Sequence, residues 1–298
     1  MRQEDGHGAS FVGSASGIHF VQSVYNAVGH SSTEEGDSSQ QELVPGEEDQ
    51  LFKGPNQRAG ETLWRPGEVE KSVEGCEVAF EDLVRWSRSY FDHWHPMLPL
   101  MDGPSFLDWC DAISGRPLQD VERHLSAHQL TILRSVLSIS LMDRRQEACH
   151  PAPNSSIPGA LVFDTFHEAV TSVQTVLTDT PSIESLQAAV SIQLFLISML
   201  RHNAASRIGG IILRLLFQMG MHRCPYRYPA FSQQDCILRQ RVFWSVYSLD
   251  RYICQSLGIP LTLRDDDVDV CMLHDEQHAR VGAPEHGECE ASLAIILC

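Results

Sequence analysis

The chain has 298 residues, of which 43% are hydrophobic, and its 22 basic residues are outnumbered by 39 acidic ones, giving a formal net charge of −17. That apolar content is typical of a globular protein and too high for a wholly disordered one, whereas the acidic charge excludes a chain that binds nucleic acid along its whole length, because neutralising phosphates needs clustered Lys and Arg. No apolar run reaches the roughly 20 residues that cross a bilayer and the N-terminus lacks the apolar core of a secretion signal, so we expect a soluble, intracellular chain that does not enter a membrane.

Charge and composition divide the chain into three parts. Residues 1–77 carry 14 acidic and 5 basic residues, with a short apolar island at 11–28 and a Ser-, Glu- and Gln-rich stretch that predicts a disordered acidic linker. Residues 78–261 are nearly balanced in charge and contain most of the periodic apolar pattern, which predicts the folded domain. Residues 262–298 are again acidic and are predicted to form a tail.

The middle part shows the three- and four-residue apolar spacing of helices. The first helix is predicted from residue 80 to just before Pro96, and the last from Ser232 to the sequence Gly258-Ile259-Pro260, which ends it. Between them we expect helices that start near Asp102 and at about 120, 160, Ser182 and Asn203. Since no stretch shows sustained strand alternation, the fold class is all-α: a multi-helix bundle or array of antiparallel helix pairs.

One carboxylate falls on an apolar stripe. Asp250 recurs at helical spacing with Phe243 and Tyr247, and a buried carboxylate without a partner is costly. We therefore predict an ion pair between Asp250 and Arg214 or Arg207 of the preceding helix, and expect the loss of Asp250 to cost about 3–5 kcal/mol. The alternative is that these two arginines bind an anionic ligand.

Metal and catalytic patterns are weak. The nine cysteines include no Cys-x-x-Cys pair, which excludes zinc sites built on close thiolate pairs. His274 and His278 lack the Glu placement of a metalloprotease helix, and the acidic run from Asp265 to Asp269 is more typical of a solvated loop than of a cation site. No nucleophile, base and orienting group stand together, so we expect no catalytic residues, no bound metal and no cofactor in this chain.

Several segments, taken in order, resemble the regulatory domain of fungal binuclear-zinc-cluster transcription factors, also called the middle homology or xylanolytic-activator-type domain. Residues 13–20 (Gly-Ser-Ala-Ser-Gly-Ile-His-Phe) resemble the short signature ahead of that domain, and residues 90–99 are similar to the end of its first helix. Residues 219–223 (Met-Gly-Met-His-Arg) resemble its Gly-Leu-His-Arg segment. The most specific match is residues 239–251, which resemble the run Arg-Arg-Arg-x-Trp-Trp-x-x-Tyr-x-x-Asp-Arg.

The resemblance covers about 10–30 and 78–273 and implies a non-catalytic domain of a nuclear regulator of RNA polymerase II transcription. It implies contact with the transcription machinery or a co-regulator, a small-molecule inducer and a homodimer as further partners, and DNA binding only through a zinc cluster that this chain does not show. The residues that carry the structural or regulatory motif are Arg207, Arg214, His222, Arg223, Arg241, Trp244, Tyr247, Asp250, Arg251, Gly258 and Pro260. The chain is either a fragment of a longer factor or a relative without the cluster.

Two other functions remain open. One is a free-standing helical sensor or protein-interaction module that does not bind DNA, with a ligand pocket lined by Trp244, Tyr247 and the face carrying Arg207 and Arg214. The other is an unrecognised helical enzyme whose site is assembled only in space.

Overall fold

The computed structural model describes residues 16, 24, 62–70, 77–147 and 156–272. The predicted disordered linker, most of the apolar island and the residues from 273 onward, with His274 and His278, lie outside the described residues. In the described part, helices dominate and the strands are two residues each, which confirms the all-α fold class.

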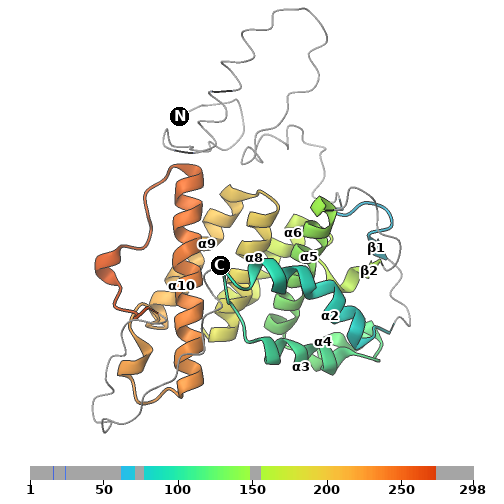
Figure 1. The fold of residues 1–298 in the computed structure, drawn as a ribbon, viewed down its shortest axis with the longest axis horizontal. Coiled ribbons are helices and arrows are strands. Elements are labelled where there is room, and N and C mark those ends of the chain that lie inside the picture. Colours follow the sequence, from blue (N-terminus) through green and yellow to red (C-terminus); the bar gives the residue numbers. More distant parts are fainter. Residues whose placement is uncertain (1–15, 17–23, 25–61, 71–76, 148–155, 273–298) are drawn as a thin grey trace, which may run out of the picture.

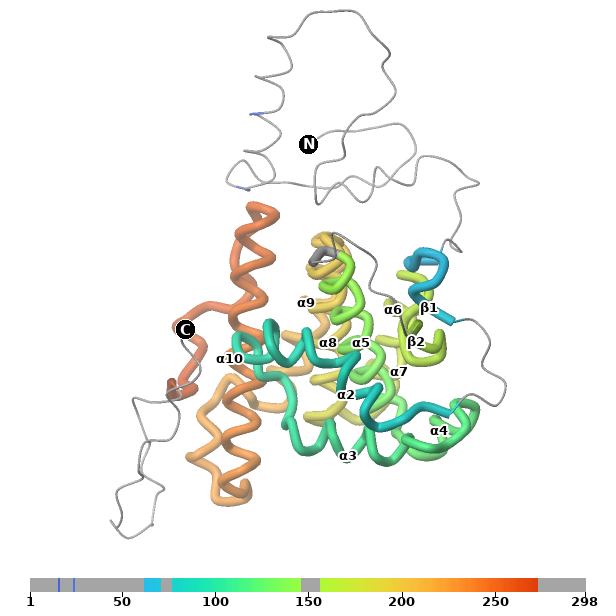
Figure 2. Tube along the Cα trace, turned by 45° about the vertical axis from the view of Figure 1, so that its right-hand side comes forward, coloured from blue at the N-terminus to red at the C-terminus, as the bar shows by residue number. Residues whose placement is uncertain are grey.

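The helices stack side by side in an order that places α8 at the centre (Figure 1). α5 (Ala127–Glu147) packs against α8 (Ile183–Ser198), α8 against α9 (His202–Gln218), and α9 against α10 (Gln233–Leu257), which stands at one side of the molecule. On the far side of α5 lies α2 (Phe80–Ser89), followed by the π-helical turn η1 (Tyr90–Trp94), α3 (Gly103–Ile113) and α4 (Val121–His124). Figure 2 shows the same succession from a second direction.

The central position of α8 follows from its composition. From Ser185 to Ser198 every residue of this helix is buried, which is expected of a helix with apolar residues all round. Its polar side chains are paired: Gln187 donates to the Leu100 carbonyl at 2.7 Å, and Gln193 donates to the Ala205 carbonyl at 3.1 Å. The buried amides therefore join α8 to its neighbours without leaving unsatisfied groups.

The helix starts show which sequence signals were decisive. Ser182 and Ser185 form a reciprocal capping box at the start of α8, and Ser232 does the same with Asp235 at the start of α10, as predicted. α10 ends at Gly258, whose φ of 65° is left-handed, a conformation that an L side chain adopts only with strain.

Three predicted boundaries differ. The expected helix at about 120–143 is interrupted at Leu125, which is extended, and Ser126 then exchanges hydrogen bonds with Gln129 at 3.1 Å in both directions. The expected helix at about 160–178 is divided into α6 (Phe166–Thr171), capped by Thr165, and α7 (Val173–Thr178). Asn203 does not cap α9, because the helix begins at His202 and Arg201 occupies its N-cap position.

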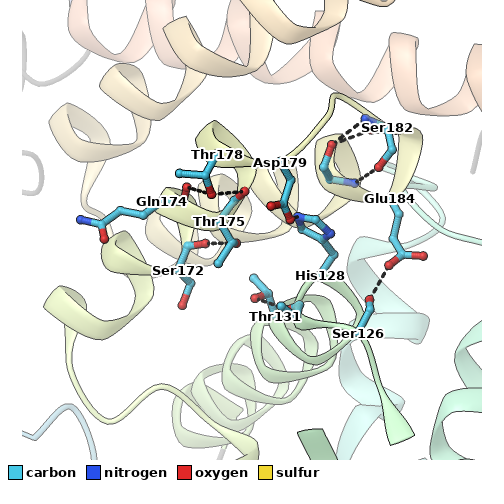
Figure 3. Close-up of polar contacts among 12 residues, drawn as sticks. Ser126, His128, Thr131, Ser172, Gln174, Thr175, Thr178, Asp179, Ser182 and Glu184 are labelled. Atoms are coloured by element: carbon cyan, nitrogen blue, oxygen red, sulfur yellow. Dashed lines mark hydrogen bonds and ion pairs between the residues drawn. The ribbon is translucent and has the colours of Figure 1, made fainter. Parts of the chain in front are cut away.

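A polar joint holds the starts of α5 and α8 to the end of α7 (Figure 3). His128 Nε2 lies 3.5 Å from the Asp179 carboxylate, and Ser126 donates to Glu184 Oε1 at 2.5 Å. His124 is not part of this joint, since its ring lies against Arg116 at 2.6 Å. The two histidines of α4 and α5 therefore have separate partners and do not converge on one site.

The packed part extends beyond residues 78–261. β1 (Val69–Glu70) pairs in parallel with β2 (Ile157–Pro158), and Trp64 is only 6% exposed. After α10, Leu263 and Val270 are buried in the same core as the helices. Residues 62–70 and 262–272, assigned to the flanking segments on charge and composition, thus pack against the helical array.

Candidate regulatory site

Four motif residues of α10, namely Trp244, Tyr247, Asp250 and Arg251, contact one segment, residues 258–272, which we call the strap. Leu263 is hydrogen-bonded to Asp250, and Asp265 to Tyr247. Cys271 is hydrogen-bonded to Trp244, which is nearer the start of α10. The order of these contacts shows that the strap runs antiparallel to α10 from its C-terminal end toward its middle, as the red-orange segment beside α10 in Figure 1 illustrates.

Asp250 anchors the beginning of the strap. Its side chain is buried, and its Oδ2 accepts hydrogen bonds from the backbone N–H groups of Thr262 and Leu263, each at 3.3 Å. Arg251 Nη1 lies 3.5 Å from the same oxygen. The expectation that Asp250 is buried and paired is met, but its partners are the strap backbone and its own neighbour in the chain.

The predicted pair between Asp250 and Arg207 or Arg214 is wrong. Both arginines lie on the exposed face of α9, whereas the side of α10 that carries Asp250 is covered by the strap. Helical spacing alone places Asp250 on a stripe but does not say which segment covers that stripe. Arg251 reaches the carboxylate because its long side chain can bend back.

The middle of the strap is held by a cluster of Tyr247, Arg251 and Asp265. Arg251 forms an ion pair with Asp265, and its guanidinium carbon lies 3.4 Å from the centre of the Tyr247 ring. The Tyr247 hydroxyl donates to Asp265 Oδ1 at 2.9 Å. Burial and this hydrogen bond raise the pKa of Tyr247, so the phenol stays protonated and can donate. Tyr247 and Arg251 therefore together hold Asp265.

The far end of the strap is held through a backbone carbonyl. The Cys271 carbonyl accepts from Trp244 Nε1 at 3.0 Å and from Gln240 Nε2 at 3.2 Å. Gln240 is buried and Trp244 partly so, so this fixed pair of donors is shielded from competing water. Sequence reasoning singled out Trp244 but not Gln240.

The loop between α9 and α10 also holds the strap, through Asp269. The backbone N–H of Asp269 donates to the His222 carbonyl at 3.1 Å, and the Asp269 carboxylate accepts from the Cys224 N–H at 2.8 Å. Arg227 and Arg223 lie 2.9 and 3.6 Å from that carboxylate. Burial and the charge of Arg223 lower the pKa of His222, which favours a neutral ring.

The remaining motif residues have separate roles. Arg241 is half-buried and lies near His95, in the segment 90–99 that resembles the end of the family's first helix. Burial and the Arg241 charge lower the pKa of that histidine. Pro260 is exposed at the first bend of the strap, and its carbonyl accepts from the Cys254 thiol at 3.3 Å. Ser16, in the N-terminal signature, is buried and donates to the Ser256 carbonyl near the end of α10.

The acidic residues of the strap are the functional positions that sequence reasoning missed. Asp265 and Asp269 were assigned to a solvated loop. The side chain of Asp265 is indeed 74% exposed, and its neighbour Asp266 is exposed too, but Asp265 and Asp269 each also receive an arginine and a further donor. The signal in the sequence was the spacing of Asp265 and Asp269 among apolar Leu263, Val268 and Val270, which is more apolar than a solvated loop requires.

A cavity of about 290 Å³ opens at the loop between α9 and α10. It is lined by the end of α9, the loop that follows and the start of α10, including Met219, Tyr228 and Phe231. Arg239 also lines it, with its guanidinium carbon 4.0 Å from the centre of the Phe231 ring. This cavity does not include Trp244, Tyr247, Arg207 or Arg214, the residues at which the sequence led us to expect a pocket.

In the described ranges, no group of three or more His, Cys, Asp and Glu side chains is placed to hold a metal ion. The zinc cluster that the resemblance implies has no fitting donor set there. None of the helices in these ranges combines the length and the apolarity needed to cross a bilayer.

Comparison with known proteins gives one family and several curated relatives. FUP6 of Fusarium proliferatum, a probable transcription factor, is 28% identical over 205 residues, which are 62% of this chain and 26% of that protein. The transcriptional activator protein acu-15 of Neurospora crassa is 27% identical over 185 residues, covering 60% of this chain and 18% of that protein. Activator of stress genes 1 of Saccharomyces cerevisiae is 30% identical over 93 residues, or 31% of this chain and 10% of that protein.

The chain thus spans about a quarter or less of the length of these relatives. No solved structure gives a significant match. The model of the family described as fungal specific transcription factor domain matches residues 88–281. This range holds α3 to α10, the whole strap and every one of the motif residues assigned above. The chain belongs to this family of fungal specific transcription factor domains.

Proposed function

We propose that this chain is the non-catalytic regulatory part of a nuclear transcription factor, whose DNA contacts and zinc come from a separate segment. Support comes from the family match over 88–281 and from relatives named as transcription factors and activators. The single observation that carries the regulatory role is that the motif residues of α10 fasten the strap. Their polar groups are used to hold a segment of the chain in place, which suits a domain that changes contacts with a co-regulator or the transcription machinery.

A reporter assay tests this role. The whole chain, fused to an unrelated DNA-binding module in yeast, is expected to change transcription from a promoter that carries the module's site. Trp244→Phe removes the indole donor to the Cys271 carbonyl and keeps an aromatic ring. The lost hydrogen bond contributes about 1 kcal/mol, so the equilibrium between the attached and the detached strap should shift by about fivefold toward the detached state. Reporter output should change accordingly.

The matched control is Trp109→Phe, at a half-buried tryptophan of α3, which should behave as the unchanged fusion. The regulatory proposal is contradicted if the module alone, the unchanged fusion and the Trp244→Phe fusion give equal output while protein level and promoter occupancy are equal.

A second function, small-molecule sensing, is favoured by the cavity at the α9–α10 connection. Arg239 is half-buried there, and among the described residues no carboxylate lies within ion-pair distance of it. Burial lowers the pKa of Arg239, against the opposing charge of Asp235, so its guanidinium carries a desolvation cost that an anion would offset.

The cavity chemistry suggests the ligand class. Tyr228, Phe231, Met219 and Met221 provide flat and adaptable apolar walls, and Arg239 provides a planar fork suited to a carboxylate. At about 290 Å³ the cavity suits a molecule about the size of one ring. We therefore propose that the domain senses a small aromatic carboxylate.

Titration calorimetry with benzoate tests the sensor proposal. Arg239→Met keeps the apolar stem and removes the charge, and affinity should fall about tenfold, the effect of losing a charge-assisted hydrogen bond. Neutral benzamide should bind the unchanged chain equally weakly. Arg207→Met, at an exposed arginine of α9, should leave binding unaltered. The sensor proposal is contradicted if the unchanged chain binds benzoate with a Kd above about 1 mM, or if Arg239→Met binds it equally well. Neither result affects the regulatory proposal, which the reporter assay tests.

A further inference from the structure

Two buried thiols meet where the strap joins the α9–α10 loop. Cys224 Sγ and Cys271 Sγ are 3.2 Å apart, although 47 positions separate the two residues in the chain. Cys224 is fully buried and Cys271 is 4% exposed. A disulfide bond is about 2.05 Å long, so the sulfurs need to move only about 1 Å closer to be joined.

The backbone around both sulfurs is held by hydrogen bonds. The Cys224 N–H donates to Asp269 Oδ1 at 2.8 Å, and Asp269 is two residues before Cys271 on the strap. The Cys271 carbonyl accepts from Gln240 and Trp244 of α10. The two thiols approach each other because of how the strap is held, since the side chains of Asp269, Gln240 and Trp244 bond the two backbones in place.

Other described cysteines are in different surroundings. Burial raises the pKa of the Cys110 thiol to about 12, which makes a reactive thiolate rare at that position. The Cys254 thiol donates to the Pro260 carbonyl at 3.3 Å and lies 3.8 Å from Asp250. Burial and the Asp250 charge raise its pKa as well. Cys110 and Cys254 therefore serve as internal references for oxidation.

We propose that Cys224 and Cys271 form an oxidation site, at which a hydroperoxide converts the two thiols to a disulfide and so links the strap covalently to the α9–α10 loop. Cys271 is next to Met272, which is 61% exposed at the end of the described strap. A small peroxide therefore meets Cys271 before Cys224, which is fully buried. This modification depends on the fold of the strap and stands whether or not the chain regulates transcription.

The chemistry is balanced with the peroxide as the oxidant. The Cys271 thiol loses its proton and the thiolate attacks one peroxide oxygen. The O–O bond breaks, Cys271 becomes a sulfenic acid, and the released hydroxide takes up that proton and leaves as water. The Cys224 sulfur then attacks the Cys271 sulfur, the S–O bond breaks, and the second water leaves with the Cys224 proton. Two thiols and one hydrogen peroxide give one disulfide and two waters, and a dithiol reductant reverses the product.

The link closes a long loop of the chain, from Cys224 through α10 to Cys271. Closing such a loop restricts the unfolded chain, so it stabilises the folded state. For a domain of this size we expect the melting temperature to rise by about 5–10 °C after oxidation.

Peptide mapping tests the proposal directly on the unchanged chain. The purified full-length protein is treated with hydrogen peroxide, its free thiols are alkylated in denaturant, and the digest is analysed by mass spectrometry. A cross-linked peptide joining Cys224 to Cys271 is expected, together with alkylated Cys110 and Cys254. Dithiothreitol should remove both the cross-link and the rise in melting temperature.

Variants provide the matched comparison. Cys224→Ser and Cys271→Ser should each abolish the rise in melting temperature after peroxide treatment, whereas Cys110→Ser and Cys254→Ser should keep it. The proposal is overturned if the unchanged, folded chain shows no cross-link between Cys224 and Cys271, or if peroxide links another pair of cysteines in its place. Because the mapping uses the wild-type chain, a variant that fails to fold does not decide the result.

Discussion

Replacing Asp250 with alanine is expected to lower the free energy of unfolding by about 3 kcal/mol. The substitution leaves the backbone N–H groups of Thr262 and Leu263 without their acceptor and removes the anion that faces Arg251. Buried donors left without partners cost about 1–3 kcal/mol, and the loss of the carboxylate adds to that because Arg251 is only 22% exposed. Urea unfolding of the full-length chain measures the change.

Two further variants identify the cause. Asp250→Asn keeps an oxygen for the strap amides and removes the charge, so its loss should be smaller than that of Asp250→Ala. Asp266→Ala removes a carboxylate of the same strap whose side chain is 85% exposed, and it should change stability by less than about 0.5 kcal/mol. If Asp250→Ala costs as little as Asp266→Ala, then Asp250 does not hold the strap.

Replacing Trp64 with alanine is expected to cost about 3–5 kcal/mol, the range for removing a large buried aromatic side chain. Trp64 is 6% exposed, and its Nε1 donates to the Phe163 carbonyl at 2.7 Å. Arg145 lies over the same ring at 5.5 Å and also pairs with Glu68. Thermal and urea unfolding of the whole chain measure the loss.

The control for Trp64 is an exposed apolar residue. Met97 is 66% exposed, and Met97→Ala should change stability by no more than about 0.5 kcal/mol. Trp64→Phe, which mainly removes the hydrogen bond, should cost about 1 kcal/mol. A loss for Trp64→Ala no larger than that for Met97→Ala would place residues 62–70 outside the folded domain and restore the boundary that composition indicated.

The helices could be predicted because their signals are local. Ser182 with Ser185 and Ser232 with Asp235 lie three residues apart, so the capping boxes can be read directly from the chain. The start at Ser126 is the exception. Its partner Gln129 also lies three residues away, so this boundary is marked locally as well, although it was not predicted.

The site was predictable only in part. The motif resemblance singled out Trp244, Tyr247 and Arg251, and all three contact the strap. It did not reveal what they contact, because Asp265 and Cys271 lie 14 or more positions away and beyond the predicted end of the domain. Asp250 shows the same limit: burial followed from helical spacing, whereas the choice between Arg214, Arg207 and the strap backbone depended on a tertiary contact.

If the oxidation and regulatory proposals both hold, they meet at the same segment. Asp250 holds the beginning of the strap, and Cys271 near its end lies against Cys224. A disulfide would therefore tie down the far end of the segment that the α10 motif residues hold. The reporter assay with Trp244→Phe and the peptide map of the oxidised chain measure these two properties independently.

By itself the sequence determined the helical class, the main helix starts and the family resemblance, because periodicity, caps and motifs are properties of neighbouring residues. Only the tertiary structure decided that Trp64 and the strap belong to the core, that Asp250 holds backbone amides, and that Cys224 lies against Cys271. The physical reason is that burial and pairing depend on which distant segments fold over a helix face. Neither charge nor composition along the chain encodes that choice locally.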